Sequence, residues 1–201
     1  MLSTLPLPDA DIRFDPDFLT TTRADALFDQ LRHAIAWETH YIRLFGREIA
    51  SPRLSCWIGD EGASYIYSGA RFEPRPWPPA LALLCEEITL AAGERCNSVL
   101  ANLYRDGRDG MGWHSDDEPE LGPQPVIASL SLGATRRFCL KHKQAGAKSV
   151  AVELPHGSLL LMRGNTQQNY RHALPKTAKA VTERINLTFR RILPPRQRVT
   201  G

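Results

Sequence analysis

The feature that most constrains the fold is a change of hydrophobic period near residue 97. Up to residue 193, the chain beyond this point consists of short alternating or apolar runs, among them VIASLSLG, SVAVELP and RINLTFRRI. Clusters of Gly, Pro, Asp and Asn separate these runs at roughly the spacing found in β-sandwiches and barrels. Residues 95–193 are therefore predicted to form a β-barrel or jelly roll.

The preceding part of the chain contains two helical patterns. Residues 22–37 carry apolar side chains at helical spacing and can be capped by Thr21 or Thr22. The expected buried face of this helix consists of Leu27, Leu31, Ala34 and Ile35. A second helix is expected over residues 79–92, entered through prolines and closed by Gly93. The predicted fold class is α+β, in one domain of 201 residues whose N-terminal part, residues 1–50, is helical.

The composition narrows the class of protein. Hydrophobic residues make up 42% and charged residues 23% of the chain, which is the balance of a soluble globular protein. No apolar run approaches the ~18 residues that span a bilayer, and the N-terminus does not resemble an export signal. We therefore expect a monomer with no membrane contact, located in the cytoplasm of a bacterium or in the nucleus of a eukaryote.

The cysteines and the basic residues give weaker signals. Cys56, Cys85, Cys96 and Cys139 show no CxxC spacing, so reduced structural thiols are expected. Basic residues gather in RRFCLKHK, residues 136–143, and again from Arg190 to Arg198. Such clusters would suit a polyanionic partner, and an ordinary solvated surface explains them equally well.

Residues 51–72 are expected to form a hairpin that turns at residues 59–62. Tyr65 and Tyr67 are two positions apart, so in a strand they share a face. Packing within the hairpin is the simpler explanation for these aromatic residues. The alternative is a platform on which a planar ligand stacks.

The stretch GMGWHSDDEPELG contains a candidate metal site. His114 and Asp116 are two residues apart, so in an extended segment both side chains point to the same side. His172, which follows a buried-looking strand and a polar loop, is the candidate for a third ligand. Two imidazoles and one carboxylate form the facial triad of non-haem Fe(II) oxygenases, and they could equally hold a catalytic zinc ion.

The stretch RINLTFR suggests an anion site. Its alternation places Ile185, Leu187 and Phe189 on one face, and Arg184, Asn186, Thr188 and Arg190 on the other. If the second face lines a barrel interior, its arginines need carboxylates or phosphates as partners. Asn102 and Tyr104 show the same alternation, and together these residues would form a receptor for a dicarboxylic acid. The alternative is the polar outer face of an edge strand.

In combination, these segments resemble the AlkB family of Fe(II)- and 2-oxoglutarate-dependent dioxygenases. The resemblance covers about residues 50 to 193 and rests on NLYRDGRDGMGWHSDDE, VIASLSLG, RRFCLKHK, LPHGSLLLMRGNTQQNYRHALP and RINLTFRRI in the family's order. It implies a double-stranded β-helix, or jelly roll, in which His114, Asp116 and His172 hold the catalytic Fe(II). It further implies five residues that bind the co-substrate 2-oxoglutarate: Arg184 and Tyr104 at the distal carboxylate, Asn102 and Arg190 near the other, and Asn186 on the same strand.

The resemblance also suggests substrate contacts. The segment with SYIYSG and PRPWP is similar to the family's nucleotide-recognition lid, which makes Tyr65 and Tyr67 candidates for the base pocket. Asp117 and Glu118 stand where family members place acids that touch the exocyclic group of a damaged base. Trp113 is a further candidate, only because it lies beside His114.

The function implied by the resemblance is oxidative demethylation of N-alkylated bases in DNA, as part of alkylation repair. The reaction would consume O2, convert 2-oxoglutarate to succinate and release formaldehyde, and the sequence leaves open whether RNA is also a substrate. One alternative is an oxygenase of the same chemistry that acts on RNA, protein or a small molecule. Another is a non-catalytic, metal-containing jelly roll that only binds its partner.

Overall fold

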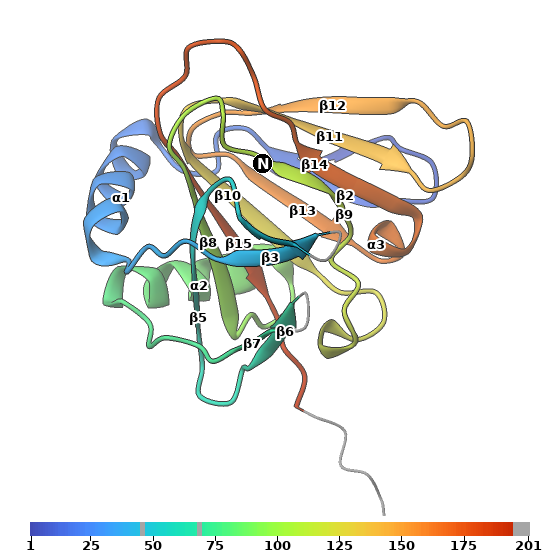
Figure 1. Ribbon diagram of the computed structural model, residues 1–201. Helices are drawn as coiled ribbons and strands as arrows, with labels where there is room; N and C mark the ends of the chain where they lie inside the picture. The colour runs from blue at the N-terminus through green and yellow to red at the C-terminus, as the bar shows by residue number, and fades with distance from the viewer. Residues whose placement is uncertain (45–46, 68–69, 195–201) are drawn as a thin grey trace, which may run out of the picture.

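The computed structural model describes residues 1–44, 47–67 and 70–194, with side chains left undescribed at 42–47 and 65–72. Two sheets of antiparallel neighbouring strands form the body of the molecule (Figure 1). The larger sheet has seven strands, in the order β1 (Ser3–Leu5), β2 (Asp11–Asp15), β13 (Leu159–Arg163), β10 (Ile127–Gly133), β15 (Arg184–Arg190), β8 (Ser98–Tyr104) and β5 (Leu54–Gly59). The smaller sheet has four, in the order β12 (Ser149–Leu154), β11 (Arg136–His142), β14 (Tyr170–Leu174) and β9 (Met111–His114). This arrangement confirms the predicted jelly roll.

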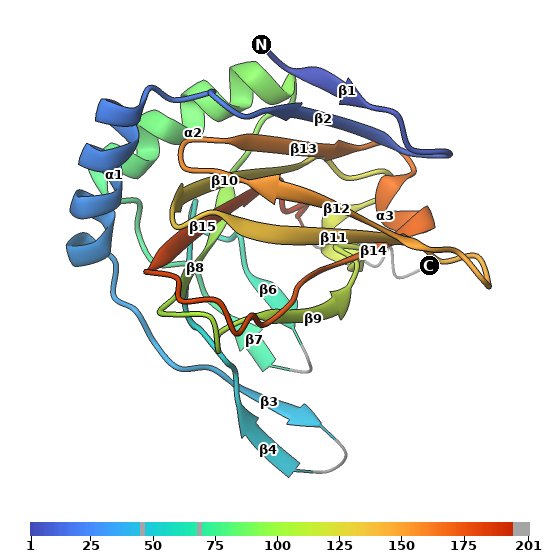
Figure 2. The same ribbon diagram turned by 90° about the horizontal axis from the view of Figure 1, so that it is seen from above.

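Two helices cover one face of the larger sheet (Figure 2). Leu31 of helix α1 (Thr21–Ala34) and Leu84 of helix α2 (Pro79–Ala92) belong to the same buried cluster as Leu130 of β10 and Leu187 of β15. A second apolar cluster lies between the two sheets and includes Phe138. Strands β10 and β15 are therefore covered on both faces, and their other face looks into the space between the sheets.

The helix ends follow local sequence signals. As predicted, α2 ends at Gly93, which adopts the left-handed conformation at φ 70°. The cap of α1 is Thr20, whose side chain accepts a hydrogen bond from the Arg23 backbone, and not Thr21 or Thr22. Ala34 is exposed, and Ala24 contributes to the buried face instead, in a helix that begins one residue earlier than predicted and ends at residue 34. None of the helices in the described ranges is long and apolar enough to cross a bilayer.

The description of residues 1–50 as helical was wrong in part. Strand β2 pairs with β13 and buries Ile12 completely, and β1 pairs with β2 at the sheet edge. A further hairpin consists of β3 (Tyr41–Leu44) and β4 (Arg47–Ala50). The short N-terminal strands cover backbone groups of β13 that would otherwise be unpaired.

The predicted hairpin over residues 51–72 was also wrong in its pairing. Strand β5 pairs with β8, with Cys56 opposite Ala101, and becomes an edge of the larger sheet. The hairpin in this region is shorter and consists of β6 (Tyr65–Tyr67) and β7 (Ala70–Phe72). The turn after Gly59 therefore connects two different sheets, because β8 supplies the hydrogen-bonding partner that β6 was expected to supply.

All four cysteines are buried and reduced, as predicted. Burial raises the pKa of Cys56 and Cys85 to about 11 and that of Cys96 to about 12. Their thiols therefore stay protonated at neutral pH and act as apolar packing groups.

Candidate metal centre and its pocket

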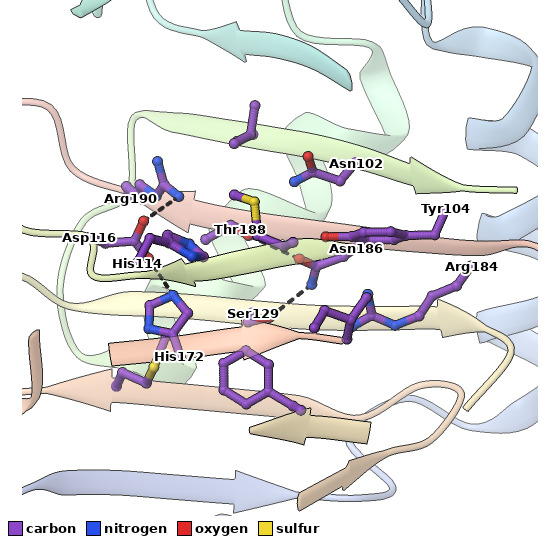
Figure 3. Close-up of a pocket in the computed structure, with 15 residues that line it drawn as sticks. Asn102, Tyr104, His114, Asp116, Ser129, His172, Arg184, Asn186, Thr188 and Arg190 are labelled. Atoms are coloured by element: carbon purple, nitrogen blue, oxygen red, sulfur yellow. Dashed lines mark hydrogen bonds and ion pairs between the residues drawn. The ribbon is translucent and has the colours of Figure 1, made fainter. Parts of the chain in front are cut away.

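Two neighbouring strands place the predicted histidine ligands side by side. His114 ends β9 and is directly opposite His172 of β14, and the two ring centroids are 4.2 Å apart. Asp116 follows two residues after His114, and its Oδ2 atom is 3.6 Å from Nε2 of His172. One ligand atom from each of the three residues lies within 4.8 Å of the others (Figure 3). Since metal–ligand bonds of about 2 Å place two ligands of one ion up to about 4 Å apart, small side-chain adjustments bring all three onto one ion.

Hydrogen bonds hold His114 and the segment with Asp116 in place. Nδ1 of His114 is 2.9 Å from the Gly112 carbonyl oxygen, which leaves Nε2 to face a metal. The Asp116 backbone N–H donates to Oε1 of Gln167 over 2.9 Å. Gln167 belongs to the short helix α3 (Thr166–Asn169), which directly precedes β14. The loop that carries Asp116 is thereby tied to the strand that carries His172.

The charges around the ligands favour metal binding. Burial alone would raise the pKa of Asp116, but Arg190, whose Nη2 donates to Oδ1 over 2.8 Å, and the two histidines lower it overall. Burial, reinforced by His114, lowers the pKa of His172 to about 3. At neutral pH the site therefore offers an ionised carboxylate and a neutral imidazole, which are the protonation states that bind metals.

A cavity extends from the metal ligands along β15 and β8 to Arg184 (Figure 3). It encloses about 480 Å³, including its open mouth, and its polar lining residues are Asn102, Tyr104, His114, Asp116, Ser129, His172, Arg184, Asn186, Thr188 and Arg190. The Arg184 guanidinium donates to Ser131 Oγ over 2.8 Å and lies 5.3 Å from the centroid of the Tyr104 ring. No carboxylate among the described residues pairs with Arg184, and its buried Nε has no hydrogen-bond partner there. Burial lowers the pKa of Arg184 to about 10, so its side chain is still a cation at neutral pH. It can therefore bind an anion at the far end of the cavity.

Strand β15 decides between the two readings of RINLTFR. It lies between β10 and β8 in the larger sheet, and all seven of its residues are buried. The alternative of a polar outer face on an edge strand was therefore wrong. Arg184 and Asn186 face the cavity, while Ile185 and Leu187 belong to the core beneath the helices.

The remaining predicted co-substrate residues line the same cavity but differ in their contacts. Oδ1 of Asn102 accepts a hydrogen bond from Nε of the buried Arg53 over 2.8 Å, which leaves its amide N–H groups for a ligand. Asn186 donates to Ser129 Oγ and to the Leu130 carbonyl, so it mainly holds β15 against β10.

Comparisons with known proteins agree with this geometry. Residues 11–190 match the family model described as the 2OG-Fe(II) oxygenase superfamily. Over 188 residues the chain is 40% identical to alpha-ketoglutarate-dependent dioxygenase alkB homolog 3 of Bos taurus, a match that covers 89% of this chain and 65% of that protein. The chain belongs to the AlkB family. It is also 39% identical over 180 residues to DNA oxidative demethylase ALKBH2 of Homo sapiens, covering 85% of this chain and 69% of that protein.

A solved structure of OsALKBH1 shows the same fold, with a TM-score of 0.65 at 16% identity, over 95% of this chain and all of that one. The chain spans about two thirds of the length of the curated AlkB relatives it matches. The AlkB family implies bound Fe(II), 2-oxoglutarate and O2. The residues present fit these groups, because the donor set suits Fe(II) and because the buried Nε of Arg184, which has no hydrogen-bond partner among the described residues, can bind an anion.

The structure does not bring every predicted substrate residue to the cavity. Trp113 precedes His114 in β9, so its side chain points to the opposite face of the strand and lines a separate groove. Asp117 is exposed and accepts a hydrogen bond from Lys143 over 3.1 Å. Neither Asp117 nor the half-buried Glu118 is among the residues that line the cavity. Tyr65 and Tyr67 lie in β6, and their side chains are outside the described part of the structure.

Several residues that line the pocket of this AlkB-family chain, or support its lining, were missed in the sequence. Ser129 and Ser131 could have been found, because they alternate with Leu130 and Leu132 in β10 and so share the face opposite the core. The ring centroids of Phe138 and His172 are 5.3 Å apart, but nothing in the local sequence indicates that Phe138 is a pocket residue. Likewise, Arg53 and Gln167 carry no local signal, since their contacts depend on tertiary structure.

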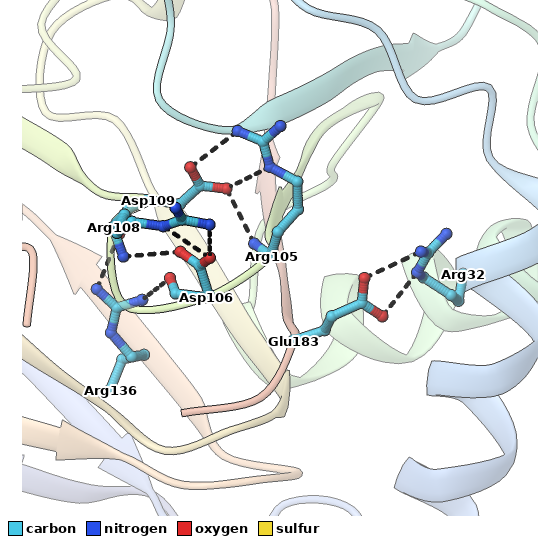
Figure 4. Close-up of polar contacts among 7 residues, drawn as sticks. All are labelled: Arg32, Arg105, Asp106, Arg108, Asp109, Arg136 and Glu183. Atoms are coloured by element: carbon cyan, nitrogen blue, oxygen red, sulfur yellow. Dashed lines mark hydrogen bonds and ion pairs between the residues drawn. The ribbon is translucent and has the colours of Figure 1, made fainter. Parts of the chain in front are cut away.

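The loop between β8 and β9 is fixed by ion pairs (Figure 4). Asp109 accepts hydrogen bonds from the backbone N–H, Nε and Nη2 of Arg105. Arg136 is buried and donates to the carbonyls of Asp106, Asp109 and Pro175. Arg136 therefore belongs to the scaffold that holds β9, and the prediction that placed it in a polyanion-binding cluster was wrong. Arg196 and Arg198, from the second predicted cluster, lie outside the described residues.

Proposed function

We propose that this AlkB-family protein removes alkyl groups oxidatively from the nitrogen atoms of DNA bases, in the repair of alkylation damage. The observation that carries the proposal is the convergence of His114, Asp116 and His172 in a cavity that ends at Arg184, which has no carboxylate partner among the described residues. The relatives described as DNA oxidative demethylase in Homo sapiens, Mus musculus and Arabidopsis thaliana support this choice of substrate. We further infer that the protein acts as a monomer inside the cell, on the DNA of the cytoplasm or the nucleus.

The protein side chains position the reactants. Bound Fe(II), together with 2-oxoglutarate and O2, supplies the oxidation that hydroxylates the N-methyl carbon, while 2-oxoglutarate becomes succinate and carbon dioxide. His114, Asp116 and His172 would hold the ion, since they supply the two imidazoles and one carboxylate of a facial triad. Arg184 and Tyr104 bind the distal carboxylate, and the Asn102 amide contacts the rest of the co-substrate. The hydroxymethyl group then leaves the base nitrogen as formaldehyde and restores the base.

Apolar side chains limit the access of water to this chemistry. Leu100, Met111, Phe138 and Leu174 line the cavity around the metal ligands. A base in a duplex must leave the stack to reach them, at a cost of a few kcal/mol that is smallest for a damaged or single-stranded base. We propose that Tyr65 and Tyr67 contact this base, and that Asp117 and Glu118, which do not line the cavity itself, contact its exocyclic group.

The proposal is tested by supplying Fe(II), ascorbate and 2-oxoglutarate with and without a methylated oligonucleotide, and by measuring succinate, formaldehyde and repaired base. We expect formaldehyde and repaired base in equal amounts. His114→Ala and Asp116→Ala should abolish all three products without unfolding the protein. His33→Ala is the matched control, because His33 is exposed on α1 and its ring forms a hydrogen bond with the Asp29 carbonyl of the same helix.

Two other results would contradict the proposal. Succinate without base repair would indicate an oxygenase that acts on RNA, protein or a small molecule. If neither succinate nor formaldehyde forms in folded, iron-loaded protein, the chain is a binding module without catalytic activity.

A further inference from the structure

A second groove lies on the outer face of the smaller sheet. It measures about 670 Å³ with its open side included, and it is lined by Trp113 of β9, Arg171 of β14, Lys141 and His142 of β11 and the loop residues 143–146. Trp113 is 48% exposed, which is unusual for the largest apolar side chain. A wide, flat aromatic surface is thus available to a ligand from solution.

The groove is positively charged. Lys141 and Arg171 are directly opposite each other on paired strands, and both are exposed. Like charges in this arrangement destabilise a sheet. Among the described residues no acidic side chain pairs with either of them, whereas Lys143 at the groove's edge already binds Asp117. The sheet therefore keeps a cationic pair that an anionic ligand would stabilise.

The groove lies directly behind the metal site. Trp113 and Arg171 immediately precede His114 and His172 in their strands, so the groove and the metal cavity occupy opposite faces of one strand pair. Strand β9 is the edge of its sheet, so a ligand can pass around it from one face to the other. At that edge Gly112 is exposed, and a Cβ atom there would meet no protein atom within 4 Å. Among the described residues, the space directly beside Gly112 is therefore open.

We propose that this groove binds a nucleotide that flanks the target base in a single strand. Its base stacks on Trp113, and its phosphate lies between Lys141 and Arg171. Stacking of this kind requires an unpaired base, so the groove favours single-stranded over duplex substrates. The inference rests on the proposed function, because it takes the nucleic acid that enters the metal cavity as the ligand that continues into the groove.

Binding of unmodified oligonucleotides tests the groove independently of catalysis. Fluorescence anisotropy gives the dissociation constants of labelled dT3, which is too short to fill both faces, and of dT12. In the wild type dT12 should bind more tightly than dT3. Trp113→Ala should reduce this advantage about tenfold, because a base loses the aromatic ring on which it stacks. Trp113→Phe should restore most of it. Arg171→Ala should lower the slope of log affinity against log salt by about 0.7, the single-strand value for one phosphate contact.

The matched charge control is Arg95→Ala, because Arg95 is exposed, does not line the groove and pairs with Asp60. It should leave the salt slope unchanged. The proposal is overturned if Trp113→Ala weakens dT3 and dT12 equally, if Phe fails to restore binding, or if a dT12·dA12 duplex is as sensitive as the single strand. It is also overturned if a hexaglutamate peptide competes as well as dT6, since the groove would then recognise charge alone. Because no turnover is measured, these results hold whether or not the protein proves to be a demethylase.

Discussion

Replacing Arg184 by methionine separates ligand binding from stability. Arg184 is 2% exposed, and its protein contacts are the Ser131 hydroxyl and the Tyr104 ring, with no carboxylate among the described residues. A buried cation without a counterion destabilises the folded protein. We therefore expect Arg184→Met to abolish 2-oxoglutarate binding and to make the ligand-free protein more stable.

The magnitude follows from the pKa of Arg184, which burial lowers from 12.5 to about 10. At about 1.4 kcal/mol per pKa unit, this shift corresponds to about 3 kcal/mol. Loss of the hydrogen bond and the ring contact offsets part of it, so the expected gain is about 1–3 kcal/mol in the free energy of unfolding. Since the folded-state pKa is the lower one, the penalty is complete below pH ~10 and is relieved only as the pH rises above it. The gain should therefore be the same at pH 6 and pH 8.

Arg136→Met provides the contrast. Arg136 also lies near the Tyr104 ring, but it donates to three backbone carbonyls, so its loss should cost about 3 kcal/mol. Chemical denaturation of both variants gives the stabilities. A thermal shift assay at a concentration about 100-fold above the wild-type dissociation constant should show about 2.7 kcal/mol of stabilisation in the wild type and none in Arg184→Met. The reasoning is refuted if Arg184→Met is less stable than the wild type and still responds to 2-oxoglutarate.

Three further predictions concern the scaffold. Gln167→Ala should weaken Fe(II) binding about 10- to 100-fold, as measured by titration, because the loop that carries Asp116 loses its hydrogen bond to Gln167. An unchanged Fe(II) affinity would show that Gln167 does not position Asp116. Gly107→Ala should lower the free energy of unfolding in urea by about 1–3 kcal/mol, because its Cβ would lie 2.4 Å from the Thr177 carbonyl oxygen. Gly112→Ala should lower it by less than about 1 kcal/mol, because its Cβ would meet no described atom within 4 Å. Equal losses would contradict the packing argument. Thiol reagents at pH 8 should not label Cys96 in the folded protein, since burial raises its pKa to about 12, and rapid labelling without unfolding would disprove this.

The sequence by itself determined the features that depend on neighbouring residues. Period-two alternation in RINLTFR predicted both the core side chain Leu187 and the cavity side chain Arg184, because successive residues of any strand point to opposite faces. The same rule predicted that His114 and Asp116 share a side. Gly93 marked the end of α2, since a left-handed cap favours glycine.

Tertiary structure alone decided which strands pair and which polar groups are buried. Strand β5 pairs with β8 and not with β6, and the register of β9 against β14 places His172 opposite His114. Tertiary structure also separates the basic residues of RRFCLKHK. Arg136 is buried because it donates to three carbonyls of distant loops, whereas Lys141 is exposed. Strand pairing and burial depend on backbone hydrogen bonds and packing between segments far apart in the chain, and such partners leave no trace in the local sequence.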